Sequence, residues 1–76
     1  MKHEIRINEY YLTTDNLIVV CIEDDVGFDL IGMRMYEFRV IYPKKEYPVS
    51  YLIEKRNVDD WIKKKLSKDE IVFELI

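Results

Sequence analysis

Four carboxylates lie within seven residues of this 76-residue chain, and they form its densest group of chemically useful side chains. They are Glu23, Asp24, Asp25 and Asp29. A hard cation such as Ca²⁺ needs about six or more oxygen ligands at set positions of a loop, and the D-x-D-x-D-G order of such a loop does not occur here. The sequence instead predicts a solvated turn at 24–27, where the glycine takes a conformation that other residues avoid. Such a turn would offer an acidic knob to a basic partner.

Nucleophilic chemistry has few candidate side chains. The one histidine, His3, lies near a terminus, and neither Ser50 nor Ser67 has a histidine near it in the sequence. The one cysteine, Cys21, lies inside an apolar run, where a thiol is more often an inert part of the core than a reactive thiolate. We therefore expect a protein that is not an enzyme and that holds no metal or cofactor.

Basic side chains gather in the second half of the chain. Residues 44–68 contain eight basic and four acidic side chains, interleaved with aromatic ones. This combination is typical of single-stranded nucleic-acid binding, although the net charge of −3 weighs against it. A nucleic-acid-binding module that uses segment 42–68 is therefore the alternative function. Its candidate contacts are Lys44, Lys45, Lys63, Lys64, Lys65 and Lys68.

Aromatic and methionine side chains are the candidate anchors for a protein partner. Tyr10 and Tyr11 interrupt the alternation of the first predicted strand, while Met33 and Met35 lie beside charged residues. Methionine is flexible and polarisable, which suits an adaptable contact surface. The alternative is that the two methionines fill the second side of a barrel core.

The elements that must position these residues are predicted mainly as β-strands. Isoleucine and valine number 17, and the chain contains no alanine, the strongest helix former. The strand near Pro48 must lie at a sheet edge, because proline lacks an N–H, unless Ser50 caps a helical turn there. The predicted strands cover residues 4–12, 17–23, 28–33, 35–42 and 47–53.

The C-terminal third carries the helix signals. An apolar stripe at helical spacing predicts a helix over 58–67, with Asn57 as its N-cap. Two predictions stay open for residues 71–76. The segment is rich in β-formers, which favours a last strand, whereas Ser67 and Glu70 have the spacing of a capping box, which favours a second helix.

The second predicted strand is apolar on both faces. Val19 and Cys21 point to one side, and Ile18, Val20 and Ile22 point to the other. Such a strand is normally covered on both faces, and one short helix covers only one face of a small sheet. The sheet must therefore curl into a small barrel, whose strand spacing resembles that of SH3-like barrels, or a second copy or partner must cover the second face.

The predicted architecture is a single α+β domain over residues 1–76. It has a twisted antiparallel sheet of four to six strands, which can close into an SH3-like barrel, and one C-terminal helix. A lone cysteine suits the cytoplasm, and the longest apolar run, six residues, is too short to cross a membrane. The scarcity of Ala and Gly fits AT-rich coding, as in a low-GC bacterium or its phage.

The predicted function is a non-enzymatic protein–protein interaction module. A small regulator or a phage-type inhibitor of a host protein would act in this way, by occupying a surface. Homodimers are also predicted, from the two-faced strand and the β-rich tail. The expected partner contacts are Glu23, Asp24, Asp25, Asp29, Tyr10, Tyr11, Met33 and Met35.

Overall fold

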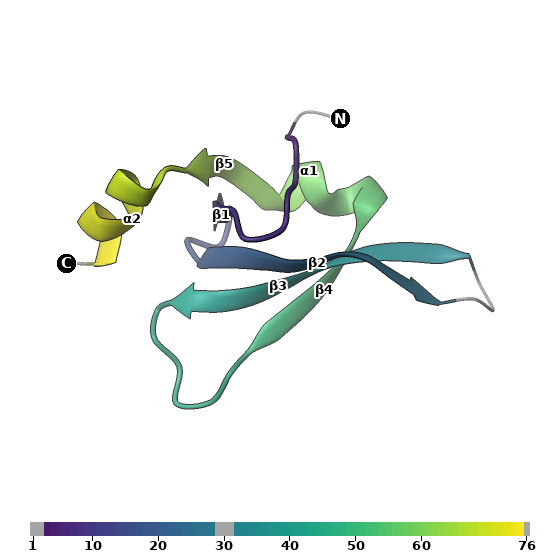
Figure 1. Ribbon diagram of the computed structural model, residues 1–76, viewed down its shortest axis with the longest axis horizontal. Coiled ribbons are helices and arrows are strands. Elements are labelled where there is room, and N and C mark those ends of the chain that lie inside the picture. The colour runs from purple at the N-terminus through teal and green to yellow at the C-terminus, as the bar shows by residue number, and fades with distance from the viewer. Residues whose placement is uncertain (1–2, 29–31, 76) are drawn as a thin grey trace.

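The fold is described by a computed structural model that places residues 3–28 and 32–75. Figure 1 shows the elements in their spatial arrangement. In chain order they are β1 Tyr10–Thr13, β2 Ile18–Phe28, β3 Met33–Tyr42, β4 Ser50–Glu54, the 3₁₀ turn η1 Lys55–Asn57, α1 Val58–Trp61, β5 Ile62–Leu66 and α2 Lys68–Leu75.

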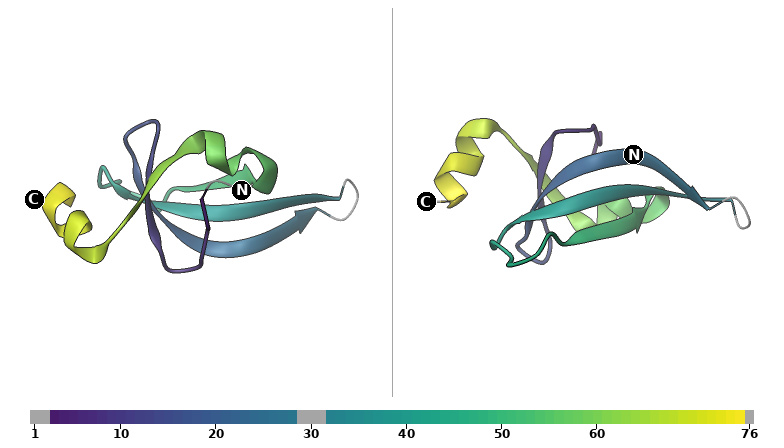
Figure 2. Two further views of the ribbon diagram at one scale, coloured as in Figure 1. Left: turned by 90° about the horizontal axis from the view of Figure 1, so that it is seen from above. Right: turned by 60° about the horizontal axis from the view of Figure 1, so that its bottom comes forward.

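The strands form one antiparallel sheet in the order β4-β3-β2-β1-β5. β2, β3 and β4 follow one another as a meander, whereas β5 returns across the molecule to pair with β1. The sheet is strongly twisted, so that β5 crosses β3 at a steep angle when the molecule is seen from above (Figure 2). This arrangement confirms a sheet-dominated α+β domain, with β4 at an edge as Pro48 predicts.

β2 is longer than its sequence suggests. It continues through the acidic stretch, and Gly27 pairs with Arg34 on β3. The predicted turn at 24–27 is therefore wrong. The predicted strand at 28–33 is wrong at its two ends, because Phe28 ends β2 and Met33 begins β3, and its residues 29–31 lie outside the described part of the chain. The positive φ expected of Gly27 belongs instead to Gly32, at +64°. The register between β2 and β3 shifts twice within residues 21–26, and these bulges break the alternation by which a continuous strand is recognised.

β1 is shorter than the strand predicted over 4–12. Asn8 has a φ of 69°, in the left-handed region, which interrupts an extended chain. The segment before β1 still follows β2, because the Asn8 N–H donates to the Cys21 carbonyl and the Cys21 N–H donates to the Glu9 carbonyl. The chain turns after β1, where the Asn16 N–H donates to the Thr13 carbonyl at 3.0 Å.

The helix predicted over 58–67 is wrong beyond its first turn. α1 ends at Trp61, Ile62 is already extended, and β5 then pairs with β1, with Lys64 opposite Leu12. Ile62 and Leu66 are buried and the three lysines between them are exposed, a four-residue repeat that a helix would also give. Pairing with β1 satisfies backbone groups that would otherwise form a sheet edge, whereas an isolated helix of this length is marginal.

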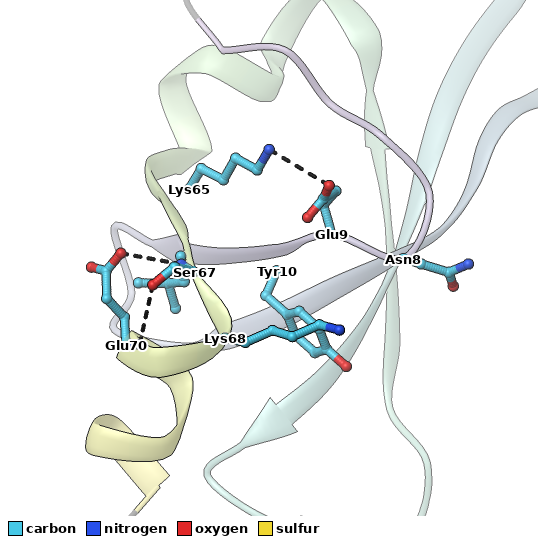
Figure 3. A pocket seen from close by; sticks show the side chains of 8 residues that line it. Asn8, Glu9, Tyr10, Lys65, Ser67, Lys68 and Glu70 are labelled. Carbon is cyan, nitrogen blue, oxygen red and sulfur yellow. Dashed lines mark hydrogen bonds and ion pairs between the residues drawn. The ribbon is translucent and has the colours of Figure 1, made fainter.

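The chain runs into a second helix, not a last strand, over the residues of 71–76 that are described. Ser67 and Glu70 form a reciprocal cap, drawn in Figure 3. The Ser67 N–H donates to Glu70 Oε1 at 3.1 Å, and the Glu70 N–H donates to Ser67 Oγ at 3.2 Å. Lys64 Nζ lies 2.9 Å from Glu70 Oε2. The single C-terminal helix of the prediction is thus replaced by a one-turn α1 inside the chain and by α2.

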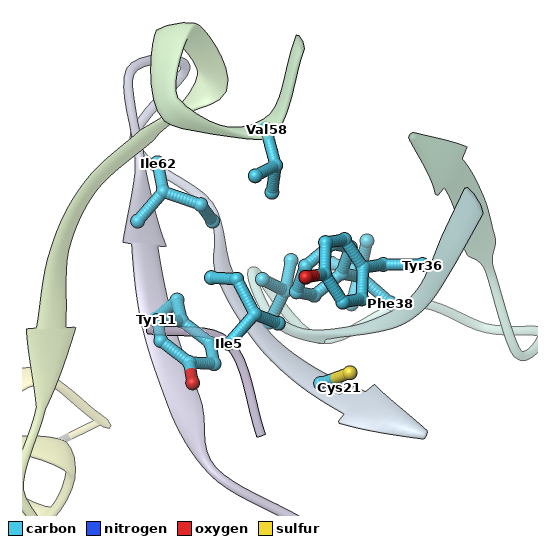
Figure 4. Packing of buried hydrophobic residues seen from close by; sticks show 9 residues of the cluster. Ile5, Tyr11, Cys21, Tyr36, Phe38, Val58 and Ile62 are labelled. Atoms are coloured by element: carbon cyan, nitrogen blue, oxygen red, sulfur yellow. The ribbon is translucent and has the colours of Figure 1, made fainter. Parts of the chain in front are cut away.

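The main core lies on one side of β2 and is built around aromatic rings (Figure 4). The Phe38 ring is fully buried, with its centroid 6.1 Å from that of Tyr11, 6.0 Å from that of Tyr36 and 5.3 Å from that of Trp61. Aromatic pairs at such distances add to the free energy of burial. The buried members of the main core are Ile5, Tyr11, Val19, Cys21, Tyr36, Phe38, Val40, Val58 and Ile62.

A second, smaller core lies on the opposite side of β2. Ile18 is only 1% exposed there, because Leu66 of β5 and Ile71 of α2 pack against it. Val20 and Ile22, farther along the same strand, belong to neither core and are half-buried. The second side of β2 is therefore covered by the chain itself at one end and left open along the rest.

Candidate protein-binding face

The open side of β2, β3 and β4 forms one continuous surface, here called the outer face. Residues paired across neighbouring strands point to the same side of a sheet. The register places Val20 between Tyr10 and Arg39, and it places Glu37 between Glu23 and Leu52. The register assigns to the outer face Tyr10, Val20, Glu23, Val26, Met35, Glu37, Arg39, Leu52 and Glu54. Ile22 lies at the bulge between Cys21 and Glu23, is half-buried and belongs to neither core, and it is counted with this face.

Apolar side chains on the outer face remain accessible. Leu52 is 45% exposed, and Val20, Ile22 and Met35 are half-buried without belonging to either core. At one end of the face, Tyr42 of β3 is exposed opposite Ile18. Single exposed apolar residues are ordinary, but a contiguous group on a sheet face is typical of a contact surface.

Two like charges face each other in the middle of this apolar surface. Glu23 and Glu37 are direct partners across β2 and β3. Carboxylates in such positions repel each other and destabilise the strand pair. Within residues 3–28 and 32–75, neither of them forms an ion pair, and nor does Arg39 beside them. The outer face therefore holds a negative charge that the described part of the chain leaves unneutralised.

The predicted acidic group is divided by the strand. Glu23 lies on the outer face, whereas Asp25 contacts Lys55 Nζ at 3.4 Å and Arg34 Nε at 3.8 Å. The same Lys55 ammonium lies 5.0 Å from the centre of the buried Tyr36 ring, on the side of the main core. Asp24 is exposed, and Asp29 lies outside the described residues.

The predicted aromatic and methionine anchors lie in different parts of the structure. Tyr11 is 0% exposed, so its prediction as a surface contact is wrong. Its hydroxyl donates to the Glu4 carbonyl at 3.0 Å and accepts the Arg6 N–H at 2.9 Å, and burial raises the pKa of the phenol. Tyr10 and Met35 lie on the outer face. Met33 begins β3 opposite Phe28, beyond the end of β4.

Glu37, Val20 and Leu52 are among the outer-face residues that the sequence analysis missed as contacts. The alternation along residues 18–22 placed Val20 on a second apolar side, which was a usable signal. Glu37 and Leu52 gain their significance from the register that joins β2, β3 and β4. Register between strands is not visible in one sequence.

The candidate nucleic-acid lysines are all exposed, but they are not gathered on one face. Because β5 is a strand and not a helix, Lys64 and Lys65 point to opposite sides of the sheet, and Lys63 lies at a bulge between Ile62 and Lys64. Lys65 Nζ lies 3.6 Å from Glu9 Oε1. The other three, Lys44 and Lys45 in the β3–β4 loop and Lys68 on α2, lie on different elements.

A hollow of about 420 Å³ lies where β1, β5 and α2 meet (Figure 3). Its charged lining residues are Lys65 and Lys68, together with Glu9 and Glu70. Two cations are thus balanced by two carboxylates, and one of each is already joined in the Lys65–Glu9 pair. This balance gives a phosphate group no electrostatic advantage over other occupants.

The side chains that could do covalent chemistry are not arranged for it. Cys21 is fully buried, and its Sγ donates to the Glu23 carbonyl at 3.3 Å. Burial, together with the nearby Asp24 carboxylate, raises the pKa of this thiol to about 11, so little thiolate exists at neutral pH. Among the described residues, no group of three His, Cys, Asp or Glu side chains is placed to hold a metal ion.

Comparisons with known proteins give no match: no family model, no curated protein and no solved structure aligns significantly with this chain. Over the described residues, neither helix has the length and apolar character that crossing a bilayer requires.

Proposed function

We propose that this protein is a non-enzymatic protein–protein interaction module that binds its partner through the outer face. The observation that carries the proposal is the Glu23–Glu37 pair, two carboxylates opposed across β2 and β3 within an accessible apolar surface. A partner that places Lys or Arg between them removes their repulsion. Apolar side chains of the same partner would bury Leu52 and Val20, which provides affinity while the charges provide specificity.

This activity requires occupancy of a surface and no turnover. It is how a small regulator, or a phage-type inhibitor of a host protein, would act. The inert environment of Cys21 is in keeping with a binding role, because the thiol is used in packing.

We also infer that the curled sheet is a small SH3-like barrel, left open between β4 and β5. Two features support this architecture. The last strand, β5, returns to pair with the first strand, β1, and the three-strand meander β2–β4 is followed by a 3₁₀ turn before β5.

A second copy of this chain is the second candidate partner for the outer face. This proposal rests on the apolar residues Val20, Ile22 and Leu52. The other basis of the homodimer prediction, a β-strand at the C-terminal tail, does not hold because the tail forms the helix α2. Two copies would bring four carboxylates of the Glu23–Glu37 type together, which disfavours a symmetric pairing of this face. Sedimentation across a wide concentration range tests it, and a monomer throughout would eliminate it.

Charge reversal on the outer face tests the main proposal. Glu37→Lys places a cation opposite Glu23 and is expected to raise the free energy of unfolding by roughly 0.5 kcal/mol, since a repulsive cross-strand pair becomes attractive. Capture of partner proteins from an extract of a low-GC bacterium, followed by mass spectrometry, should fall at least tenfold. A variant that is more stable but binds less distinguishes a binding surface from a structural one.

Asp69→Lys is the matched control, because it makes the same charge change at an exposed site on α2. Equal capture by the wild type, the control and Glu37→Lys would refute the outer face as the binding surface. If the eluates contain nucleic acid, and substituting Lys63 and Lys65 removes it, the nucleic-acid alternative replaces the proposal.

A further inference from the structure

We propose that a groove along the free edge of β4 binds an extended peptide segment of a partner protein through a Lys or Arg side chain. The groove has a volume of about 430 Å³ and is lined by Leu52, Ile53, Glu54, Asn57, Asp60 and Trp61. It shares Leu52 and Glu54 with the outer face, whereas Asp60 and Trp61 lie outside that face. The inference therefore goes beyond the proposed function and does not require it.

The edge of β4 provides the backbone side of the groove. β4 is the last strand of the sheet, so one row of its N–H and C=O groups has no neighbouring strand. Three consecutive β4 residues, 52–54, line the groove on one side, and residues of η1 and α1 line it on the other. A hollow that follows an open strand edge suits an extended chain, which binds there by adding a strand.

Trp61 provides a fixed aromatic surface beside this edge. Its indole packs on the buried Phe38 ring and meets the ring of Tyr51 at 5.9 Å and 62°. The indole Nε1–H donates to Asp15 Oδ2 at 3.2 Å, which sets the orientation of the ring. Tyr51 is itself 42% exposed on β4. An indole held in this way can accept a cation against its ring without losing side-chain entropy on binding.

The charges around the groove select a basic occupant. Asp60 lines it, is exposed, and has no ion pair within the described part of the chain. Glu54 also lines the groove, but its carboxylate already accepts from Arg56 Nε at 2.5 Å and from Asn57 Nδ2 at 3.2 Å. Asp15 adds a carboxylate beside the indole of Trp61, to which it is hydrogen-bonded. Lys55, the adjacent cation, is directed to Asp25 on β2.

A second copy of this chain is a poorer occupant of the same edge. Pairing β4 with another β4 would place Glu54 and Asp60 of both copies together, and like charges across such a contact are costly. Charge complementarity therefore favours a basic segment from a different protein.

The test uses two blocked seven-residue peptides of alternating Thr and Val, identical except for a central Arg or Glu. Trp61 is the one tryptophan of the chain, so its fluorescence reports directly on the groove. The Arg peptide should change this fluorescence saturably at low salt, and amide resonances of β4 should shift with it. The Glu peptide should bind at least tenfold more weakly.

Variants separate the groove from other surfaces. Asp60→Lys should weaken the Arg peptide about tenfold, whereas Glu46→Lys, the same charge change in the β3–β4 loop, should leave its affinity unchanged. Trp61→Phe leaves Asp60 in place and should reduce the preference for Arg without abolishing it. This variant contains no tryptophan, so the shifts of the β4 amides measure its binding, and Asp60→Lys carries the test if it does not fold.

Three results would overturn the inference. Equal binding of the Arg and Glu peptides, or no saturable binding, removes the cation site. If only resonances of outer-face residues shift, the peptide binds the outer face and not the groove, and the proposed function is unaffected. Shifts of β4 amides with protein concentration alone would make the edge a contact between copies.

Discussion

The two sides of β2 are alike in sequence but different in structure. On the inner side, Val19 and Cys21 are completely buried within the main core. On the outer side, Ile18 is equally buried by β5 and α2, whereas Val20 and Ile22 are left half-buried beside charged neighbours. The chain therefore closes the inner side at both Val19 and Cys21, and the outer side only at Ile18.

This difference separates residues that hold the fold from residues available for binding. Apolar area that the chain removes from water contributes about 25 cal/mol per Å² to stability, and area left accessible contributes that energy only when a partner covers it. Substitutions on the two sides of one strand should accordingly affect different measurements.

The largest effect is expected in the main core. Phe38→Ala removes a fully buried ring that contacts three other aromatic rings, and large-to-small changes of this kind cost about 3–5 kcal/mol. For so small a domain, much of the stability would be lost. Urea denaturation followed by Trp61 fluorescence measures it. A loss below roughly 1 kcal/mol would mean that the ring is not packed as described.

A smaller loss is expected in the second core. Ile18→Ala should cost about 2 kcal/mol, at the low end for a buried isoleucine, because only a few side chains surround it. Hydrogen exchange should speed up at α2 more than at β3, since Ile71 loses its contact. Uniform acceleration across the sheet would show that both cores act as one unit.

The Cys21 thiol should make a pH-dependent contribution from the inner side. Its pKa is about 11 in the folded protein, above the ordinary value of 9.0, because burial disfavours the thiolate. The folded state thus keeps a proton that the unfolded state releases, and stability should fall as pH rises from about 9 to about 11. Cys21→Ala should lose this part of the pH dependence. Parallel curves for the two proteins would contradict the buried placement.

The smallest effect on stability is expected on the outer face. Leu52→Ser should change the free energy of unfolding by less than about 0.5 kcal/mol, because the side chain is already accessible. Its effect should appear in partner capture instead. A destabilisation comparable with that of Ile18→Ala would place Leu52 in the fold and not in a binding surface.

The sequence predicted the strands that carry simple patterns and failed where two patterns coincide. The alternation over 35–42 and the two-faced run after Leu17 were sufficient for β3 and the start of β2. The helix over 58–67 failed because buried Ile62 and Leu66, with exposed residues between them, satisfy helical spacing as well as strand pairing. The pairing of this segment with β1 decides between helix and strand, and this pairing is a tertiary contact that the local sequence does not show.

The sequence identified several residues of the candidate site, but it did not show that they lie together on one surface. Glu23, Tyr10 and Met35 were identified by type, and the register later placed them on one face. Tyr11 was misplaced because an adjacent tyrosine in a strand points to the opposite side, and the tyrosine pair does not indicate which one is buried. Glu37 was missed because its role depends on standing opposite Glu23.

The openness of the outer face can be measured without knowing the partner. A soluble paramagnetic probe, added to dilute protein with labelled methyl groups, broadens the resonances of accessible methyls. The account predicts strong broadening for Val20, Ile22 and Leu52, and protection for Val19 and Ile18. Protection of Val20 and Ile22 equal to that of Val19 would contradict it, because the chain or a second copy would then already cover the proposed binding surface.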